Sequence, residues 1–226
     1  MNAQPAPKTE RRTQAQRSDA MRQRLLNATL DCLVEDGYAN TTLSGIVRRA
    51  GVSRGAQVHH YPNKQALMAD AAEHLLRRSY KELGELLLSV ANEEDRLEAL
   101  AQSVWEHMFA NPLFRAYSEL LVASQRDPEL SDAMRKLMSR FNRVFEPAST
   151  HYFERIPGAP VPMAVFGQLS AICSGIAIHT HLLEDPDFVK RQLRLWVSQA
   201  KQYMKPVKGV HTPPPRPETW DALPES

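Results

Sequence analysis

Residues 42–64 constrain this chain more than any other stretch, because they read as two short helices joined by a tight turn. Ala50 is small enough to let two helices approach closely, and Gly51 can adopt the left-handed backbone that ends a helix. Val52 can fill the gap between the helices, and Ser53 can accept a bond from a free N–H of the next helix. The pattern predicts a helix-turn-helix whose second helix lies in a DNA major groove.

The charge distribution agrees with a polyanion partner at the N-terminal end. The 226 residues carry a net charge of +2, but residues 1–64 hold ten Lys and Arg against five Asp and Glu. The rest of the chain holds 18 basic against 21 acidic side chains. A basic front on a mildly acidic body favours contact with nucleic acid, although random scatter of surface charge would also give it.

Composition also bears on the compartment. Cys32 and Cys173 lie in apolar helical patterns, so we expect buried free thiols in a reducing compartment rather than a disulfide. We find no apolar run near the roughly 18 residues of a membrane span. The first residues are charged and lack the apolar stretch of a secretory signal. These features predict a soluble, cytoplasmic protein that does not contact a membrane.

Almost all of the chain between its two ends reads as helix. An apolar period of 3.6 residues begins after Ser18, the expected first N-cap, and stops at Asp36-Gly37. The other expected helices cover 43–50, a segment after Ser53, 64–92, 94–110, 113–124, 128–153, 162–184 and 188–204. Since no two-residue alternation of useful length is found, we predict an all-α fold of about nine helices.

A run of positions between residues 20 and 67 carries a family resemblance. These positions are Leu26, Ala28, Asp36-Gly37-Tyr38, Thr41-Thr42, Ile46, Ala50-Gly51-Val52-Ser53, Arg54-Gly55, His59-His60-Tyr61, Asn63-Lys64 and Leu67. They resemble the DNA-binding domain of the TetR (tetracycline repressor) family of transcriptional regulators. The resemblance implies a ligand-responsive repressor that acts as a homodimer on a palindromic operator, with activator action left open.

The resemblance also implies how the chain is divided. Residues 1–17 would form a flexible basic arm, and 18–66 the three-helix domain that contains the helix-turn-helix. Residues 67–205 would form a larger helical ligand-binding and dimerisation domain. The Pro-rich tail, 206–226, is expected to be disordered or loosely strapped to the surface.

Carried over position by position, the resemblance gives a candidate DNA surface. The positions that would face bases are Ser44, Arg54, Gly55 and Val58, and those that would meet phosphates are Thr42, His59, His60 and Lys64. Ser53 would cap the recognition helix. Tyr61 would plug against the first helix with its hydroxyl reaching outward. Gln57 stands where an aliphatic side chain usually packs inward, so it would either pack or read adenine.

The chemistry of the basic side chains leaves alternatives open. Arg54 can fork onto guanine O6 and N7, worth roughly 1–3 kcal/mol of discrimination, or it can clamp a phosphate. Lys64 can bind a phosphate at a helix N-terminus or stay solvated. The arm residues Arg11, Arg12 and Arg17 can enter the minor groove or only add counterion release.

The body offers candidates for a ligand and for a dimer seam. An apolar or aromatic effector could contact Trp105, Met108, Phe109, Phe114, Tyr117, Phe141 and His179, although ordinary core is the alternative for each. Glu119, His107 and His181 are further polar candidates. A dimer seam could contain Ser170, Ser174, Ala177, Phe188 and Trp196, although an intrachain contact would use the same pattern.

Other functional classes find little support in the sequence. The chain contains no GxGxxG, no phosphate loop, no HExxH and no CxxC pair, so we expect neither an enzyme nor a cofactor. His59 and His60 are adjacent on a helix and point about 100° apart, so they do not suit a shared metal. The remaining alternative is an interaction protein whose helix-turn-helix does not bind DNA.

Overall fold

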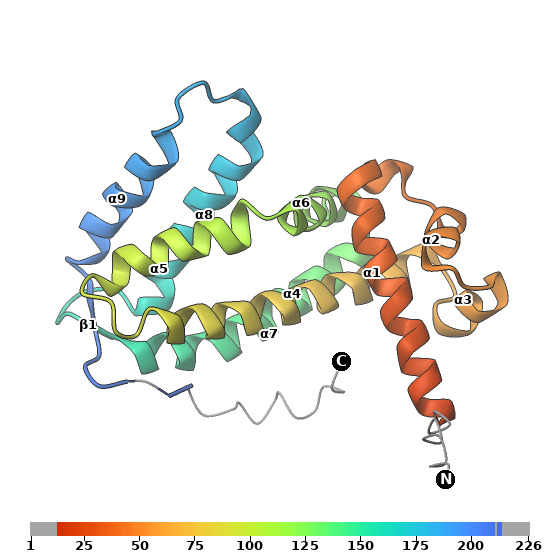
Figure 1. Cartoon of the computed structure of the whole chain (residues 1–226), viewed down its shortest axis with the longest axis horizontal. Coiled ribbons are helices and arrows are strands. Elements are labelled where there is room, and N and C mark those ends of the chain that lie inside the picture. The colour runs from red at the N-terminus through yellow and green to blue at the C-terminus, as the bar shows by residue number, and fades with distance from the viewer. Residues whose placement is uncertain (1–12, 211, 214–226) are drawn as a thin grey trace, which may run out of the picture.

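The computed structural model describes residues 13–210 and 212–213, and it is built almost entirely from helices (Figure 1). Within that range the helices are α1 (Gln14–Asn40), α2 (Leu43–Ala50), α3 (Arg54–His60), α4 (Lys64–Ser89), α5 (Arg96–Val104), α6 (Pro112–Ser124), α7 (Pro128–Tyr152), α8 (Pro162–His179) and α9 (Phe188–Ala200). Helices α1–α3 form one end, α4 and α7 run together along the molecule, and α8 and α9 lie at the other end. The predicted all-α fold is therefore confirmed.

Helix α1 begins before the predicted cap at Ser18. Thr13 Oγ1 accepts from Gln16 N at 3.2 Å, and Gln16 Oε1 accepts from Thr13 N at 2.9 Å. This reciprocal pair is a capping box, which satisfies two N–H groups that the first turn leaves free. The predicted arm, residues 1–17, therefore extends too far along the chain, because Arg17 lies exposed on α1. Arg11 and Arg12 lie outside the described residues.

The predicted stop at Asp36-Gly37 is a kink rather than an end. Gly37 has φ 73° and ψ 169°, a conformation that other residues rarely adopt, and one more helical turn follows to Asn40. Thr41 then donates to the Gly37 carbonyl oxygen from its N–H at 3.1 Å and from its hydroxyl at 2.7 Å. The kink fixes the direction in which the chain enters α2.

A short β-ribbon corrects the expectation of no sheet. Strand β1 (Phe153–Arg155) pairs antiparallel with β2 (Met204–Pro206), with Phe153 opposite Pro206. Three residues are too few for a two-residue alternation to be read from sequence. Met204, predicted on the last helix, belongs to this ribbon instead, because α9 ends at Ala200.

The first residues of the Pro-rich tail are strapped to the body. Val207 N donates to the Tyr152 carbonyl oxygen at 2.9 Å, and the buried Arg96 donates from Nη1 to the Val207 carbonyl oxygen at 3.0 Å. The strapped alternative therefore holds for this part of the tail. Residues 214–226 lie outside the described residues.

One hydrophobic cluster joins the end formed by α1–α3, where the sequence predicts DNA binding, to the body formed by α4–α9. It combines apolar side chains of α1–α4 with Ala116 and Leu120 of α6 and with Leu130 and Met134 of α7. Ala116, Leu120 and Leu130 are fully buried. The predicted boundary between residues 66 and 67 is therefore no gap in the packing, and α6 packs directly on α1.

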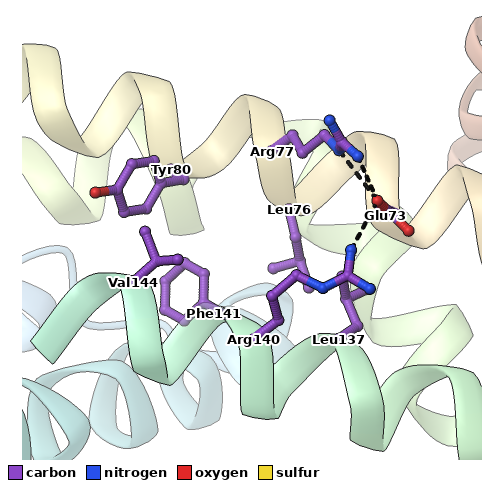
Figure 2. A pocket seen from close by; sticks show the side chains of 8 residues that line it. All are labelled: Glu73, Leu76, Arg77, Tyr80, Leu137, Arg140, Phe141 and Val144. Carbon is purple, nitrogen blue, oxygen red and sulfur yellow. Dashed lines mark hydrogen bonds and ion pairs between the residues drawn. The ribbon is translucent and has the colours of Figure 1, made fainter. Parts of the chain in front are cut away.

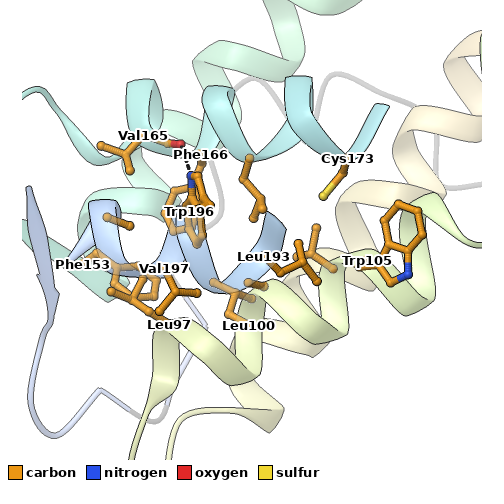
Figure 3. Close-up of a cluster of buried hydrophobic side chains, with 14 of the residues drawn as sticks. Leu97, Leu100, Trp105, Phe153, Val165, Phe166, Cys173, Leu193, Trp196 and Val197 are labelled. Carbon is orange, nitrogen blue, oxygen red and sulfur yellow. Dashed lines mark hydrogen bonds between the residues drawn. The ribbon is translucent and has the colours of Figure 1, made fainter. Parts of the chain in front are cut away.

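The second cluster fills the space between α5, α7, α8 and α9 (Figure 3). Trp196 is 1% exposed, and its indole Nε1 donates to the Val165 carbonyl oxygen at 3.3 Å. The prediction that places Trp196 in a dimer seam is wrong, because the apolar face of α9 packs against other helices of the same chain. Ala177 and Phe188 are half-buried against the same cluster.

Both cysteines are buried free thiols, as predicted. They lie far apart in the fold, since Cys32 belongs to the α1–α4 cluster and Cys173 to the α5–α9 cluster. Burial raises the pKa of the Cys173 thiol to about 12 and also raises that of Cys32. Both therefore remain unreactive thiols at neutral pH.

Helix α8 is more apolar than the sequence analysis allowed. By length and composition alone, Pro162–Leu182 could cross a membrane, with a mean hydropathy of 1.4, so the expectation of no such run is wrong. This is weak evidence for a span, since a core helix of a soluble protein passes the same test. Only 28% of the apolar window is buried, which leaves a long apolar face uncovered.

Candidate DNA-binding surface and ligand cavity

The turn between α2 and α3 is built as the sequence predicts. Gly51 has φ 62° and ψ 40°, the left-handed conformation, and its N–H donates to the Arg48 carbonyl oxygen at 3.2 Å. Val52 N donates to Val47 O at 3.2 Å, which closes the end of α2. Arg24 of α1 donates from Nη2 to the Gly51 carbonyl oxygen at 3.0 Å. The turn is therefore fixed to α1 as well as within itself.

Hydroxyl side chains cap both helices of the motif. Thr42 Oγ1 accepts from Gly45 N at 3.1 Å, and Ser53 Oγ accepts from Ala56 N at 3.2 Å. Ser44 lies beside the first cap, with its Oγ 3.1 Å from Thr42 Oγ1. All three side chains are exposed. A capping hydroxyl still has its own O–H, so Thr42 and Ser53 can donate to a phosphate while they cap.

Helix α3 turns one face outward and one inward. Arg54, Gly55, Val58 and His59 are exposed, and Val58 is exposed by 55%. Gln57 is 2% exposed, and its Nε2 donates to the Tyr61 carbonyl oxygen at 2.5 Å. The alternative in which Gln57 reads adenine is therefore wrong, since its amide closes the end of its own helix.

Tyr61 is a plug, as predicted, but its hydroxyl points inward. The ring is 6% exposed, and the hydroxyl donates to the Asp70 carboxylate. Arg22 binds the same carboxylate from Nε at 2.9 Å and from Nη2 at 2.8 Å. Burial opposes ionisation of Asp70, but the bonds from Arg22 and Tyr61 hold its pKa below the usual value. Tyr61 thus ties α3 to α1 and α4 instead of reaching DNA.

Lys64 is engaged within the chain rather than facing a phosphate. Its Nζ donates to the Tyr38 carbonyl oxygen at 2.8 Å and lies 4.2 Å from the centre of the Tyr38 ring. Burial lowers the pKa of Lys64. The phosphate role carried over from the resemblance is therefore not what this geometry favours.

His60 is half-buried beside the exposed His59, with ring centres 5.4 Å apart.

The exposed arginines around the motif differ in whether they are paired with a carboxylate. Arg49 forms a two-pronged bond with the Glu35 carboxylate, whose Oε1 accepts from Nη1 at 2.7 Å. Arg48, in the last turn of α2, and Arg54, in the first turn of α3, are both exposed. Arg48 was missed by the sequence analysis. Its position in the last turn of α2, close to the α2–α3 turn, is the signal that could have found it.

A cavity of about 170 Å³ lies in the body. It is lined by Leu75, Leu76, Ser79, Glu82, His107, Met108, Phe109, Asn111, Leu113, Phe114, Tyr117, Leu121, Met138, Phe141, Ser170 and Ser174. Five of the seven residues predicted to contact an effector, Met108, Phe109, Phe114, Tyr117 and Phe141, are among them, and so is the polar candidate His107. Two are not: Trp105 is packed in the α5–α9 cluster, and His179 is exposed and bonded to the Gly175 carbonyl oxygen at 2.8 Å.

The cavity receives two residues that were predicted at a dimer seam and three from an unusual turn. Ser170 and Ser174 of α8 line it. A π-helical turn, Trp105–Phe109, follows α5 and is closed by a bond from Ala110 N to the Trp105 carbonyl oxygen at 2.8 Å. The extra residue in this turn changes which side chains face inward, and such turns are frequent at functional sites.

One cavity hydroxyl has only a weak partner. Tyr117 donates to Met138 Sδ at 3.8 Å, and burial raises the pKa of the phenol. A thioether is a poor acceptor, so the hydroxyl has hydrogen-bonding capacity left for a better one. Phe109 and Phe114 stand beside it with ring centres 5.1 Å apart. The lining thus combines aromatic surface with polar side chains, and the Tyr117 hydroxyl is the one beside these rings.

A second hollow, between α4 and α7, holds too little space for a ligand (Figure 2). Its volume is about 30 Å³, which suits one water molecule. Glu73 on its rim accepts from Arg77 Nη2 at 2.5 Å and from Arg140 Nη1 at 3.0 Å. These bonds brace α4 against α7. No group of three or more His, Cys, Asp or Glu suited to a metal occurs among the described residues.

Comparison with known proteins adds independent evidence. Residues 25–71 match the family model described as "Bacterial regulatory proteins, tetR family". The HTH-type transcriptional regulator CymR of Pseudomonas putida is 33% identical over 137 residues, which make up 61% of this chain and 67% of CymR. The match extends well beyond the helix-turn-helix, so it includes part of the helical body.

Solved structures share the fold over most of this chain. A TetR transcription regulator from Haloarcula marismortui has a TM-score of 0.62 and 20% identity, covering 83% of this chain and 100% of that one. A transcriptional regulator from Saccharomonospora viridis, solved in complex with choline, has a TM-score of 0.61 and 16% identity, covering 83% and 99%. These structures show the fold, and the match to CymR together with the family model establishes that this chain belongs to the TetR family of helix-turn-helix transcriptional regulators, rather than to an enzyme family.

Proposed function

We propose that this regulator is a cytoplasmic, ligand-responsive repressor that binds a palindromic operator as a homodimer. The observation that carries the proposal is the presence, in one chain, of an exposed recognition face on α3 and an aromatic cavity in the body. Helix α6 connects the cavity to the DNA-binding domain, since it lines the cavity on one face and packs on α1 with another. Activator action is the second possibility, and the position of the operator relative to a promoter would separate the two.

The base-reading role is assigned to the outward face of α3. Arg54 can donate in a fork to guanine O6 and N7, and Val58 can contact a thymine methyl group. Gly55 lets the backbone approach the bases closely. The exposed hydroxyls of Thr42, Ser44 and Ser53 are suited to phosphates. His59 lies on the same face and adds a further donor.

The dimer is assigned to the uncovered face of α8. Its exposed side presents Ala164, Gly167, Ala171, Gly175 and Ile178, and Leu182 is exposed in the short 3-10 turn, Thr180–Leu182, that follows. A Cβ added at Gly167 or Gly175 would meet nothing within 4 Å, so these glycines are not required by packing within the chain. Small residues along a helix let a second helix approach closely, and a two-fold pairing brings the same face of both copies together. Burial of this face would explain the apolar composition of α8.

The effector is proposed to be an uncharged molecule built on one aromatic ring. A cavity of roughly 150 Å³ lined by apolar side chains accepts benzene, and this one measures about 170 Å³. Its described lining contains no Lys or Arg, and Glu82 in it is paired with Arg78 at 2.9 Å. A carboxylate in the ligand would therefore find no Lys or Arg as a counter-charge, whereas a carbonyl or ether oxygen would satisfy Tyr117.

In the proposed mechanism, the dimer places its two α3 helices about 34–36 Å apart, one turn of DNA. The effector lowers operator affinity only if it binds better to a state with a different spacing, because an equilibrium shifts by the difference in affinity between its two states. The cavity walls come from α4, the π-helical turn after α5, α6, α7 and α8, so occupancy can move several helices at once.

The first test selects duplexes from a random pool with the purified protein at two salt concentrations. Enrichment of a two-fold palindrome, with weaker binding at the higher salt, is the expected result. Salt-sensitive retention without enrichment would contradict sequence-specific recognition. No retention at either salt would favour the interaction-protein alternative.

The dimer has its own test. Ala171→Glu places a charge on the exposed α8 face and is expected to give a monomer by light scattering, with the helix content unchanged. Lys136→Glu, at an exposed position of α7, is the matched control and should leave the dimer intact. A dimeric Ala171→Glu variant would move the interface elsewhere.

A further inference from the structure

The junction that follows the Gly37 kink is held by side chains from outside the helix-turn-helix. Tyr38 N donates to Glu119 Oε2 of α6 at 2.7 Å. The Tyr38 carbonyl oxygen accepts from Lys64 Nζ, at the start of α4, at 2.8 Å. The Tyr38 hydroxyl donates to Asp127 Oδ2, in the α6–α7 turn, at 3.3 Å. Both backbone polar groups of one residue are therefore bonded to charged side chains.

The fit at this junction is tight around residue 37. Gly37 has a φ of 73°, and a Cβ built there would lie 3.2 Å from Glu119 Oε2. The glycine therefore serves two needs, the left-handed backbone and the approach of the carboxylate. A hydrogen bond that a backbone N–H donates to an ionised carboxylate is among the stronger hydrogen bonds in proteins.

Helix α6 connects this junction to the cavity because it has two working faces. Phe114, Tyr117 and Leu121 repeat at helical spacing and line the cavity. Ala116 and Leu120, fully buried, face α1 with Glu119 beside them. A rotation or slide of α6 that makes room for a ligand on the first face must displace Glu119 on the second, since a helix moves as a rigid element.

We propose that Glu119 is the positioning residue through which occupancy of the cavity changes the orientation of α1–α3. The carboxylate holds the Tyr38 N–H while the cavity is empty, and Lys64 holds the adjacent carbonyl against α4. Displacement of α6 breaks or redirects the Glu119 bond and frees the entry of α2. The proposal rests on the proposed ligand-responsive function, and it names the bond that transmits the response.

The test uses the full-length protein and the palindrome selected from the random pool. Glu119→Ala removes the acceptor, Glu119→Gln keeps an acceptor of the same length, and Glu106→Ala is the matched control. Glu106 is exposed and bonds only along its own helical segment, to Gln102 Nε2 at 2.6 Å. Met108→Trp, on the cavity wall, serves as a built-in occupant and avoids the need for a known effector.

Glu119→Ala is expected to weaken operator binding about tenfold, equivalent to about 1.4 kcal/mol. Glu119→Gln should stay within about threefold of the parent, and Glu106→Ala should match the parent. Amide exchange at Tyr38 should be faster in Glu119→Ala. Met108→Trp should weaken operator binding in the parent but have little further effect in Glu119→Ala, because the same bond carries both losses.

Equal operator affinity of Glu119→Ala and the parent would overturn the inference, and so would additive effects of Met108→Trp and Glu119→Ala. If Glu119→Gln is as weak as Glu119→Ala, the hydrogen bond is not the carrier. These failures leave operator binding by the parent protein intact. Failure of the proposed function is a different result, in which the parent selects no operator at all.

Discussion

The helix caps of the helix-turn-helix and the core of the body differ in the sequence distance over which their contacts act. In the helix-turn-helix, Thr42 caps α2 by accepting from Gly45 N, and Ser53 caps α3 by accepting from Ala56 N. In each case the partner lies three residues along the chain. In the body, Trp196 bonds to Val165 across 31 positions. Local contacts leave a pattern in the sequence, whereas long-range ones depend on which helix becomes the neighbour. This difference explains why a sequence motif is enough to predict the helix-turn-helix, whereas the contacts in the core of the body can be read only from the fold.

The largest expected effect concerns the core of the body. Trp196→Ala should lower the free energy of unfolding by about 3–5 kcal/mol, because it empties a fully buried site. Denaturant unfolding would measure it. Leu195→Ala changes an exposed neighbour and should cost little. A small loss in Trp196→Ala together with loss of the dimer would instead return Trp196 to the seam.

A smaller loss is expected where the DNA-binding end is tied together. Asp70→Ala should cost about 2–3 kcal/mol, below the value for a fully buried pair because Arg22 is partly exposed. The depressed folded pKa of Asp70 means that its stabilisation is present above about pH 4 and is lost as pH falls through the folded value. Unfolding of the parent and of Asp70→Ala, compared at pH 7 and in this acidic window, would check it. An equal gap at both pH values would contradict the assignment.

The sequence predicted the DNA-binding end well where the cause was local, and less well elsewhere. The caps and the Gly51 turn follow from residue type and spacing. Gln57 could not be placed, because its amide is buried only when the Tyr61 carbonyl oxygen is available to accept from it. Lys64 was assigned to a phosphate because its partner, Tyr38, lies 26 positions earlier on another helix.

In the body, the composition of the middle helices predicted the aromatic wall but not its limits. Apolar residues at helical spacing indicated that Phe114 and Tyr117 share a face, which the cavity confirms. Trp105 was misplaced because the π-helical turn that starts there changes the helical phase. Glu119 looked like a ligand partner in an apolar helix, and only the packing of α6 on α1 reveals the Tyr38 N–H opposite it.

Recognition of bases should respond to the outward face of α3 without a change in folding. Arg54→Ala is expected to reduce discrimination between the selected operator and a variant lacking the guanine by about 2 kcal/mol. Arg54→Lys keeps the positive charge but loses the fork, so it should discriminate as poorly as Arg54→Ala. Binding titrations on both duplexes would measure this, with thermal unfolding as the check on folding. Equal weakening of binding to both duplexes in Arg54→Ala would mean that Arg54 is a phosphate clamp.

The smallest expected effect lies in the cavity, where one hydroxyl should distinguish ligands of equal size. Acetophenone offers an acceptor to Tyr117 and ethylbenzene does not, so acetophenone should bind more tightly by about 1 kcal/mol. Tyr117→Phe should erase that difference, since it removes the donor and keeps the ring. Calorimetric titration of both compounds, with benzoate as the charged comparison, would measure it. Tighter binding of benzoate would show that the cavity supplies a counter-charge, and the body would then recognise its ligand by charge, as the DNA-binding end recognises phosphate.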